Sequence, residues 1–257
     1  MIELQNLKFA YPCQAPLLQN INATFAEKQI TTILGPNGCG KSTLLQLTCR
    51  LLHPSAGKIL LRGQDIHHMK SKDLARQIAL LSQTNHPPEI TVEDLVAYGR
   101  YPHQKYGQGL QKQDHIIIDH AIRQVKAENY RHRLVSNLSG GQRQRAYIAM
   151  ALAQDTDIIF LDEPTTYLDI SIRFEIMDLV RKLNQAGKTI IMVLHDLNLA
   201  LEYSDTIFLM DQGQIRMHGT PQQIVASGLL DEIFHIQTHV FEEDGQLFYH
   251  FAKNISV

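Results

Sequence analysis

The strongest constraint on the fold is a glycine-rich stretch between an apolar run and a helix-forming run. It follows the pattern G-x-x-x-x-G-K-[ST] and reads Gly35-Pro36-Asn37-Gly38-Cys39-Gly40-Lys41-Ser42-Thr43. The apolar run Thr31–Leu34 precedes it, and Leu44, Leu45 and Leu47 follow it. Glycines let backbone N–H groups turn toward phosphate oxygens, and a helix N-terminus adds partial positive charge. The stretch therefore predicts a phosphate-binding loop between a strand and a helix.

A second feature is an apolar strand that ends in two carboxylates. The run Asp157–Leu161 leads directly into Asp162 and Glu163. Taken alone, two acidic residues at the end of a strand would be interpreted as solvated side chains without a catalytic role. Downstream of a phosphate loop, a catalytic reading is favoured, because nucleotide sites form at the carboxyl ends of parallel strands.

The two features together suggest nucleotide chemistry with divided roles. We expect Lys41 to neutralise the β- and γ-phosphates. We expect Ser42 and Asp162 to ligate Mg²⁺, and Glu163 to orient or polarise an attacking water.

The remaining apolar runs predict an α/β fold with an antiparallel part at the N-terminus. Short unbroken runs suit strands covered on both faces, as in a parallel sheet. Residues 84–137 are the most polar and irregular part, so we expect an inserted helical subdomain over about 84–150. We expect the whole chain, 1–257, to form a single domain with a C-terminal extension over about 219–257. The other runs are Ile78–Leu81, Thr189–Leu194 and Thr206–Met210 for the core, Ile2–Phe9 and Leu17–Phe25 for the antiparallel part, a hairpin turn at Asp211-Gln212-Gly213-Gln214, and a helix from Asp114 to about Tyr130.

Composition and short sequence patterns argue against several classes of protein. The chain has 257 residues, 44% of them apolar, and a net charge of −2, which does not favour a nucleic-acid-coating protein. Neither a secretory signal nor a run of roughly 20 apolar residues is present. Cys13, Cys39 and Cys49 lack metal-ligand spacing, so we expect free thiols in a reducing cytoplasm. The pairs His67-His68 and His235/His239 also lack a ligand set, and we interpret them as solvated or structural.

A third stretch lies just before the acid-ended strand and reads Leu138-Ser139-Gly140-Gly141-Gln142-Arg143-Gln144-Arg145. Ser139 is a good N-cap for a helix that runs through Arg145 and Met150. The two glycines could form only a tight turn, or they could let a second phosphate-binding surface approach closely.

Leu138–Gln142, placed between a phosphate loop and an acid-ended strand, resembles the signature of ABC ATPases. Other landmarks of that family follow in order over residues 1–220. They are Tyr11, Gln83, Asp169 and His195. The resemblance implies that Tyr11 stacks on adenine, that Gln83 senses Mg²⁺ and the transporter, that Asp169 couples the two sites of a dimer, and that His195 contacts the γ-phosphate. Taken singly, each could be a structural or solvated residue. One departure is Thr166-Tyr167, where the family often has Ser-Ala.

The resemblance implies a P-loop NTPase core and a head-to-tail homodimer. ATP with Mg²⁺ would lie between the phosphate loop of one copy and Ser139–Gln142 of the other. The implied partners are polytopic membrane permease subunits and, indirectly, a periplasmic or lipoprotein substrate-binding protein, with no nucleic acid. The implied location is the cytoplasmic face of the inner membrane, as a peripheral subunit.

A narrower resemblance concerns the cargo. Tyr98-Gly99-Arg100-Tyr101-Pro102-His103 is similar to a stretch of ATPases that serve iron-siderophore, haem and cobalamin importers. Leu194–Asn198, Gly219-Thr220-Pro221 and Leu229–Phe234 fit the same group, with ferric siderophore importers the closest likeness. A haem or cobalamin importer is the alternative. A soluble ABC protein acting on RNA or DNA and a non-hydrolysing nucleotide sensor are less favoured.

Overall fold

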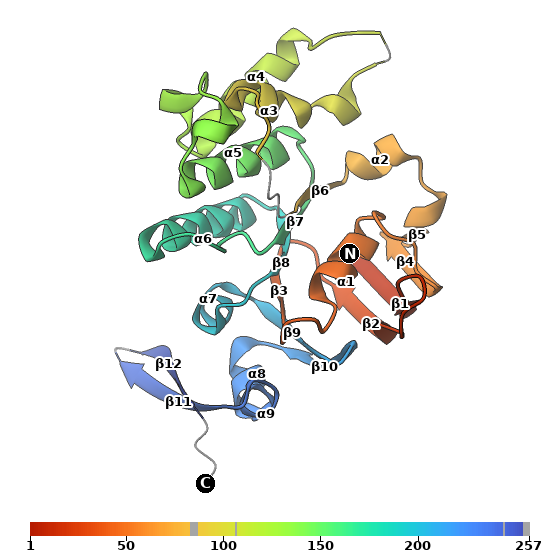
Figure 1. The fold of residues 1–257 in the computed structure, drawn as a ribbon, viewed down its shortest axis with the longest axis vertical. Coiled ribbons are helices and arrows are strands. Elements are labelled where there is room, and N and C mark those ends of the chain that lie inside the picture. The colour runs from red at the N-terminus through yellow and green to blue at the C-terminus, as the bar shows by residue number, and fades with distance from the viewer. Residues whose placement is uncertain (83–86, 106, 244, 254–257) are drawn as a thin grey trace. The chain divides into compact units, whose positions relative to one another are not determined.

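The structure is a computed structural model that describes residues 1–82, 87–105, 107–243 and 245–253 (Figure 1). It divides into two compact units, Met1–Gly63 with Val193–Val257, and Gln64–Met192. Gln83, expected to sense Mg²⁺, lies outside the described residues.

An antiparallel sheet opens the first unit, as the sequence predicts. Strand β1 (Ile2–Phe9) pairs with β2 (Leu18–Phe25) on one side and β4 (Ala56–Leu61) on the other. Its register with β2 shifts between Leu4 and Leu7, which are both buried, and Asn6 there has a φ of 50°. A bulge at Asn6 therefore explains why the buried side chains do not alternate regularly along β1.

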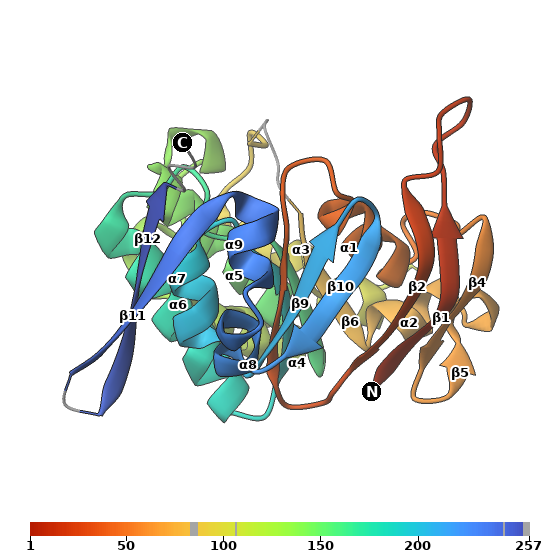
Figure 2. The ribbon, with the colours of Figure 1, turned by 90° about the horizontal axis from the view of Figure 1, so that it is seen from below.

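The phosphate loop of the first unit follows a fully buried strand. Strand β3 (Ile30–Leu34) runs parallel to β9 (Thr206–Asp211). Strand β9 pairs antiparallel with β10 (Gln214–Gly219), as Figure 2 shows. The hairpin predicted at Asp211–Gln214 is confirmed, since these two residues pair across it.

The remaining elements among the described residues of the first unit are one hairpin and four helices. Strands β11 (Ile236–Glu243) and β12 (Gln246–Lys253) pair antiparallel along their whole length, and the sequence analysis did not predict them. The helices are α1 (Lys41–Thr48), α7 (Leu197–Tyr203), α8 (Pro221–Ala226) and α9 (Leu229–Phe234).

The second unit contains the acid-ended strand. Strand β7 (Ile158–Asp162) is buried throughout and runs parallel to β6 (Ile78–Leu81), while β8 (Thr189–Val193) follows β7 in the strand order. Their continuous burial agrees with strands covered on both faces. The unit begins with β5 (Gln64–Asp65), a 3₁₀ turn at Ile66–His68 and α2 (Ser71–Ala75).

Helices make up most of the second unit between β6 and β7. Helices α3 (Val92–Tyr98), α4 (Lys112–Gln124) and α5 (Gly140–Ala153) pack on one another (Figure 1). The helix expected up to about Tyr130 ends at Gln124, because Lys126 adopts a left-handed φ of 57° that no α-helix continues through. The other helical segments are 3₁₀ turns at Tyr101–His103, Glu128–Tyr130 and Val135–Asn137, and α6 (Ile170–Gln185) after β7.

The stretch that resembles the iron-siderophore group forms a joint between these helices. A Cβ atom on Gly99 would lie 2.2 Å from the Met150 carbonyl oxygen, so only glycine permits this approach to α5. Arg100 is 5% exposed and donates to the Asp114 carboxylate and to the Ala153 carbonyl oxygen, both at 2.8 Å. The arginine therefore holds α3, α4 and α5 together, whereas its neighbours Tyr98 and Tyr101 are 59% and 68% exposed.

Within the described ranges, no helix has both the length and the apolarity needed to cross a bilayer.

Candidate functional site

The phosphate loop has the backbone geometry that its sequence requires. A Cβ atom on Gly35 would lie 2.2 Å from the Met210 carbonyl oxygen of β9, so a larger residue does not fit there. Gly38 and Gly40 have φ values of 79° and 103°, which favour glycine. Gly40 caps α1 and turns the chain from the loop into the helix, so the first N–H groups of α1 face out of the helix end.

Lys41 lies on the loop with its side chain buried. It is 5% exposed, and its Nζ donates to the carbonyl oxygens of Gly35 and Pro36 at 2.8 and 2.9 Å. The loop thus holds a cation beside a helix N-terminus, an arrangement that suits a phosphate group. Burial raises the pKa of the neighbouring Cys39 thiol, which keeps that side chain neutral.

Tyr11 belongs to the same unit and touches the start of α1. Its hydroxyl shares a hydrogen bond of 3.2 Å with the Thr43 hydroxyl, and its ring packs edge-on against Phe9 with 4.9 Å between centroids. The phenol ring is thereby fixed beside the phosphate loop, which is compatible with contact to a nucleotide base.

His195 lies two residues after β8, and its side chain is exposed. The next residue, Asp196, caps α7 by accepting from the Leu199 N–H at 3.2 Å. The cap fixes the backbone that carries the histidine.

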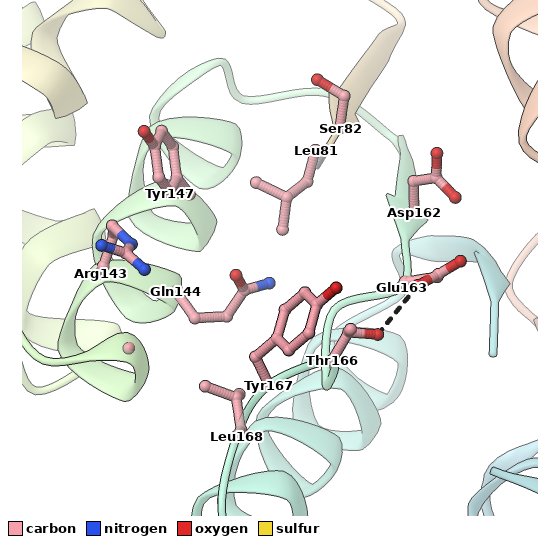
Figure 3. Close-up of a pocket in the computed structure, with 11 residues that line it drawn as sticks. Leu81, Ser82, Arg143, Gln144, Tyr147, Asp162, Glu163, Thr166, Tyr167 and Leu168 are labelled. Carbon is pink, nitrogen blue, oxygen red and sulfur yellow. Dashed lines mark hydrogen bonds between the residues drawn. The ribbon is translucent and has the colours of Figure 1, made fainter. Parts of the chain in front are cut away.

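The second unit gathers the acid pair and the start of α5 around one pocket. The pocket has a volume of about 100 Å³. Figure 3 shows Arg143, Gln144 and Tyr147 of α5 on one side of it and Asp162, Glu163 and Thr166 on the other. The sequence analysis did not predict that Arg143, Tyr147 and Thr166 line this site, because their neighbourhood depends on the packing of α5 beside the end of β7.

The end of β7 presents the two carboxylates differently. Asp162 closes the strand and is 7% exposed, whereas Glu163 follows with a left-handed φ of 52°. Thr166 donates from its hydroxyl to Oε2 of Glu163 at 3.0 Å. A non-glycine residue at positive φ is uncommon and concentrates at functional sites.

Ser139 caps α5 as the sequence predicts. Its hydroxyl accepts from the Gln142 N–H, and the Gln142 side chain accepts from the Ser139 N–H, both at 3.3 Å. This is the reciprocal capping box. The two glycines lie close to residues 166–169, which we call the coupling loop, and to α6 of the same chain. A Cβ atom on Gly140 would lie 3.5 Å from Leu168, and one on Gly141 would lie 2.8 Å from Ile172.

Asp169 caps α6 at the end of the loop after Glu163. The Ile172 N–H and then the Ser171 hydroxyl hold the pKa of its carboxyl below the ordinary value. The side chain is exposed and ionised, and its position is set by the helix it begins.

A metal site built wholly from protein side chains is absent from the residues that the structure describes, where no three His, Cys, Asp or Glu residues form a cluster that could hold an ion. Mg²⁺ does not need such a cluster, since one or two carboxylates with substrate phosphates usually suffice. The hydroxyl of Ser42 and the carboxylate of Asp162 are oxygen donors of the kind that Mg²⁺ prefers.

Comparison with known proteins gives consistent matches along the chain. The sequence profile of the ABC transporter family matches residues 18–166. A petrobactin import ATP-binding protein of Bacillus anthracis is 44% identical over 234 residues, which cover 90% of this chain and 86% of that protein. A ferric enterobactin transport ATP-binding protein of Escherichia coli (strain K12) is 42% identical over 227 residues, 88% of this chain and 84% of that protein.

Solved structures agree with the sequence matches. A putative metal-chelate type ABC transporter in an inward-facing conformation has a TM-score of 0.84 at 27% identity, with 98% of this chain and 96% of that chain covered. An ATP-binding cassette solved as a dimer with ADP and Pi has a TM-score of 0.74 at 27% identity, with 86% and 99% covered.

Proposed function

The chain belongs to the ABC transporter family and is an ATPase, and from this premise we propose that it powers an importer of ferric siderophores. The observation that carries the proposal is the agreement among curated relatives. Proteins named for the import or transport of petrobactin, achromobactin, iron(3+)-hydroxamate and ferric enterobactin are 42–44% identical over at least 87% of this chain.

The phosphate loop supports nucleotide binding in this proposal. Lys41, held beside the N-terminus of α1, neutralises charge on the β- and γ-phosphates, and the loop N–H groups bind their oxygens. Residues 35–43 form the loop, and Tyr11 stacks on the base.

The acid pair supports hydrolysis. Glu163 accepts a hydrogen bond from the attacking water and orients it, and His195 contacts the γ-phosphate. Ser42, Asp162 and Gln83 would hold Mg²⁺, which would supply positive charge to neutralise the phosphate oxygens.

The family and the relatives support the partners in this proposal. Two copies of the chain face each other head to tail, so that Ser139–Gln142 and Asp169 of one copy complete the site of the other. The pair drives polytopic permease subunits at the cytoplasmic face of the membrane, and a substrate-binding protein delivers cargo to those subunits.

The test is uptake of labelled iron by a strain that lacks the gene. We expect loss of uptake from at least one ferric siderophore, restored by the intact gene but not by Lys41→Ala. Lys58→Ala is the matched control, since Lys58 is an exposed lysine of β4 and should restore uptake fully.

The cargo panel should include haem, cobalamin, a sugar and an amino acid. Loss of haem or cobalamin uptake alone would replace the siderophore with that cargo. Normal uptake of every iron source, with loss of the sugar or the amino acid, would overturn the cargo and leave the ATPase assignment intact. Association of the tagged protein with ribosomes or DNA instead of permease subunits would overturn the transport function.

A further inference from the structure

The turn that follows Glu163 carries two bonds between the same two residues. The Thr166 N–H donates to the Glu163 carbonyl oxygen at 3.3 Å, and the Thr166 hydroxyl donates to Oε2 of the Glu163 carboxylate at 3.0 Å (Figure 3). The first bond closes the turn, whereas the second reaches the end of the glutamate side chain. An ionised carboxylate only accepts hydrogen bonds, so the hydroxyl is the donor.

The turn is held at both ends. Before it, β7 is buried along its whole length. After it, Leu168 is 8% exposed, its carbonyl oxygen accepts from Nε of Arg173 at 2.8 Å, and Asp169 caps α6. The Thr166 hydroxyl is therefore a fixed donor rather than a group on a loose loop.

The backbone of the turn is strained at two positions. Glu163 and Tyr167 have φ values of 52° and 61°, a region that non-glycine residues seldom occupy. These two residues bracket the turn, and Thr166 lies between them. Such strain persists only where the surrounding structure enforces it, and it concentrates at functional sites.

We propose that Thr166 is a positioning residue for ATP hydrolysis, whose hydroxyl holds the Glu163 carboxylate in the orientation that aligns the attacking water. The inference rests on the role proposed above for Glu163. A carboxylate has about four lone-pair positions, so a bond from Thr166 leaves capacity to accept from a water. A glutamate side chain has several rotamers, and a fixed donor at its end selects one of them.

The coupling loop gains a second role from this bond. Thr166 belongs to the segment that leads to Asp169, and Asp169 is proposed to meet the second copy of the chain. A shift of this segment moves the donor of the Glu163 carboxylate. The orientation of the glutamate thereby depends on the position of the loop.

The critical experiment compares Thr166→Val with Thr166→Ser in steady-state ATP hydrolysis by the full chain. Valine keeps the shape and the backbone N–H but removes the hydroxyl. We expect Thr166→Val to lower kcat roughly 10- to 100-fold, as for a lost hydrogen bond to a charged group. The KM for ATP should change by less than about twofold, because an interaction that acts only on the reacting water leaves ground-state binding unchanged. Thr166→Ser should restore kcat.

Thr156→Val is the matched control at the other end of β7. The Thr156 hydroxyl is buried and donates to the Ile158 carbonyl oxygen at 2.9 Å. This variant should lower the unfolding midpoint and leave kcat unchanged. A wild-type kcat in Thr166→Val would overturn the proposal. The proposal would also fail if Thr166→Val lowered both kcat and the unfolding midpoint and Thr166→Ser restored neither.

A double mutant separates this inference from the role of Glu163 itself. In the Glu163→Gln background, Thr166→Val should cause no further loss, since the carboxylate that it positions is gone. An equal fold-loss in both backgrounds would show that Thr166 acts independently and would overturn the inference alone. If Glu163→Gln itself keeps normal turnover, the assignment of Glu163 fails, and with it the basis of the inference.

Discussion

In the proposed mechanism, single side chains at the end of β7 determine whether bound ATP is hydrolysed. We predict that Glu163→Gln binds ATP normally and turns it over at less than about a tenth of the wild-type rate, a barrier change above roughly 1.4 kcal/mol. The amide keeps the shape of the side chain and cannot polarise water as a carboxylate does. Removing its negative charge should also let an ATP-bound dimer accumulate.

The measurement is single-turnover hydrolysis together with gel filtration in ATP. Glu175→Gln is the control, because Glu175 is an exposed acid of α6, ion-paired with Arg145 and distant in sequence from the acid pair. Turnover by Glu163→Gln above a tenth of the wild-type rate would remove Glu163 from the catalytic role.

At the scale of elements, the joint at Arg100 decides how three helices pack. Burial acts to raise the pKa of Asp114, but the Gln111 N–H and the Arg100 guanidinium outweigh it, and the pKa is lowered. We predict that Arg100→Met destabilises the protein by about 3–5 kcal/mol, because it leaves a buried carboxylate without its partner. Adding Asp114→Leu should recover most of this loss, since a well-packed apolar pair can replace a buried ion pair.

Urea denaturation measures both variants, with Arg123→Met as the control. Arg123 is 67% exposed and pairs with Asp119 on the surface of α4, so its loss should cost less than about 1 kcal/mol. Because the pKa of Asp114 is lower in the folded state than its ordinary value of 3.8, its ionised carboxylate stabilises the fold at pH values above 3.8. This stabilisation is lost as the pH falls through the folded-state pKa. Equal midpoints for Arg100→Met and Arg123→Met would contradict the prediction.

At the scale of the whole molecule, a single chain holds only half of each proposed site. We predict that Lys41→Ala and Ser139→Arg are each inactive alone. An equal mixture should regain about a quarter of wild-type activity, because half of the random dimers are mixed and one of the two sites in each mixed dimer is intact. Two preparations of the same variant, mixed in the same way, are the control. Normal hydrolysis by Ser139→Arg at high dilution would contradict the shared site.

The sequence predicts the parts of this molecule that depend on local pattern. Strands β1 and β6 begin and end where the apolar runs do, and the Ser139 cap is present as expected. Strands β11 and β12 were missed because their side chains are largely exposed and give no buried run, although Asp244-Gly245 is a hairpin signal.

Properties that depend on tertiary packing could not be predicted in the same way. Arg100 stands in the stretch that suggested the cargo group, yet its side chain forms its hydrogen bonds inside the fold, with Asp114 and the Ala153 carbonyl oxygen. Thr166 was noted only as a departure from the family pattern, and its contact with Glu163 requires the strained turn between them.

The start of α5 also bears on the choice of amino acid at its N-cap position, Ser139. Serine, threonine, asparagine and aspartate all start helices well. The Ser139 oxygen receives the Gln142 N–H, while the hydroxyl proton remains a donor in its own right. Aspartate would serve the helix equally and repel an incoming phosphate, whereas asparagine and threonine would bring bulk beside Gly140 and Gly141. A small hydroxyl therefore suits both the cap and the role proposed for Ser139, because its oxygen accepts from the helix while its O–H can donate a hydrogen bond to an anion on a facing surface.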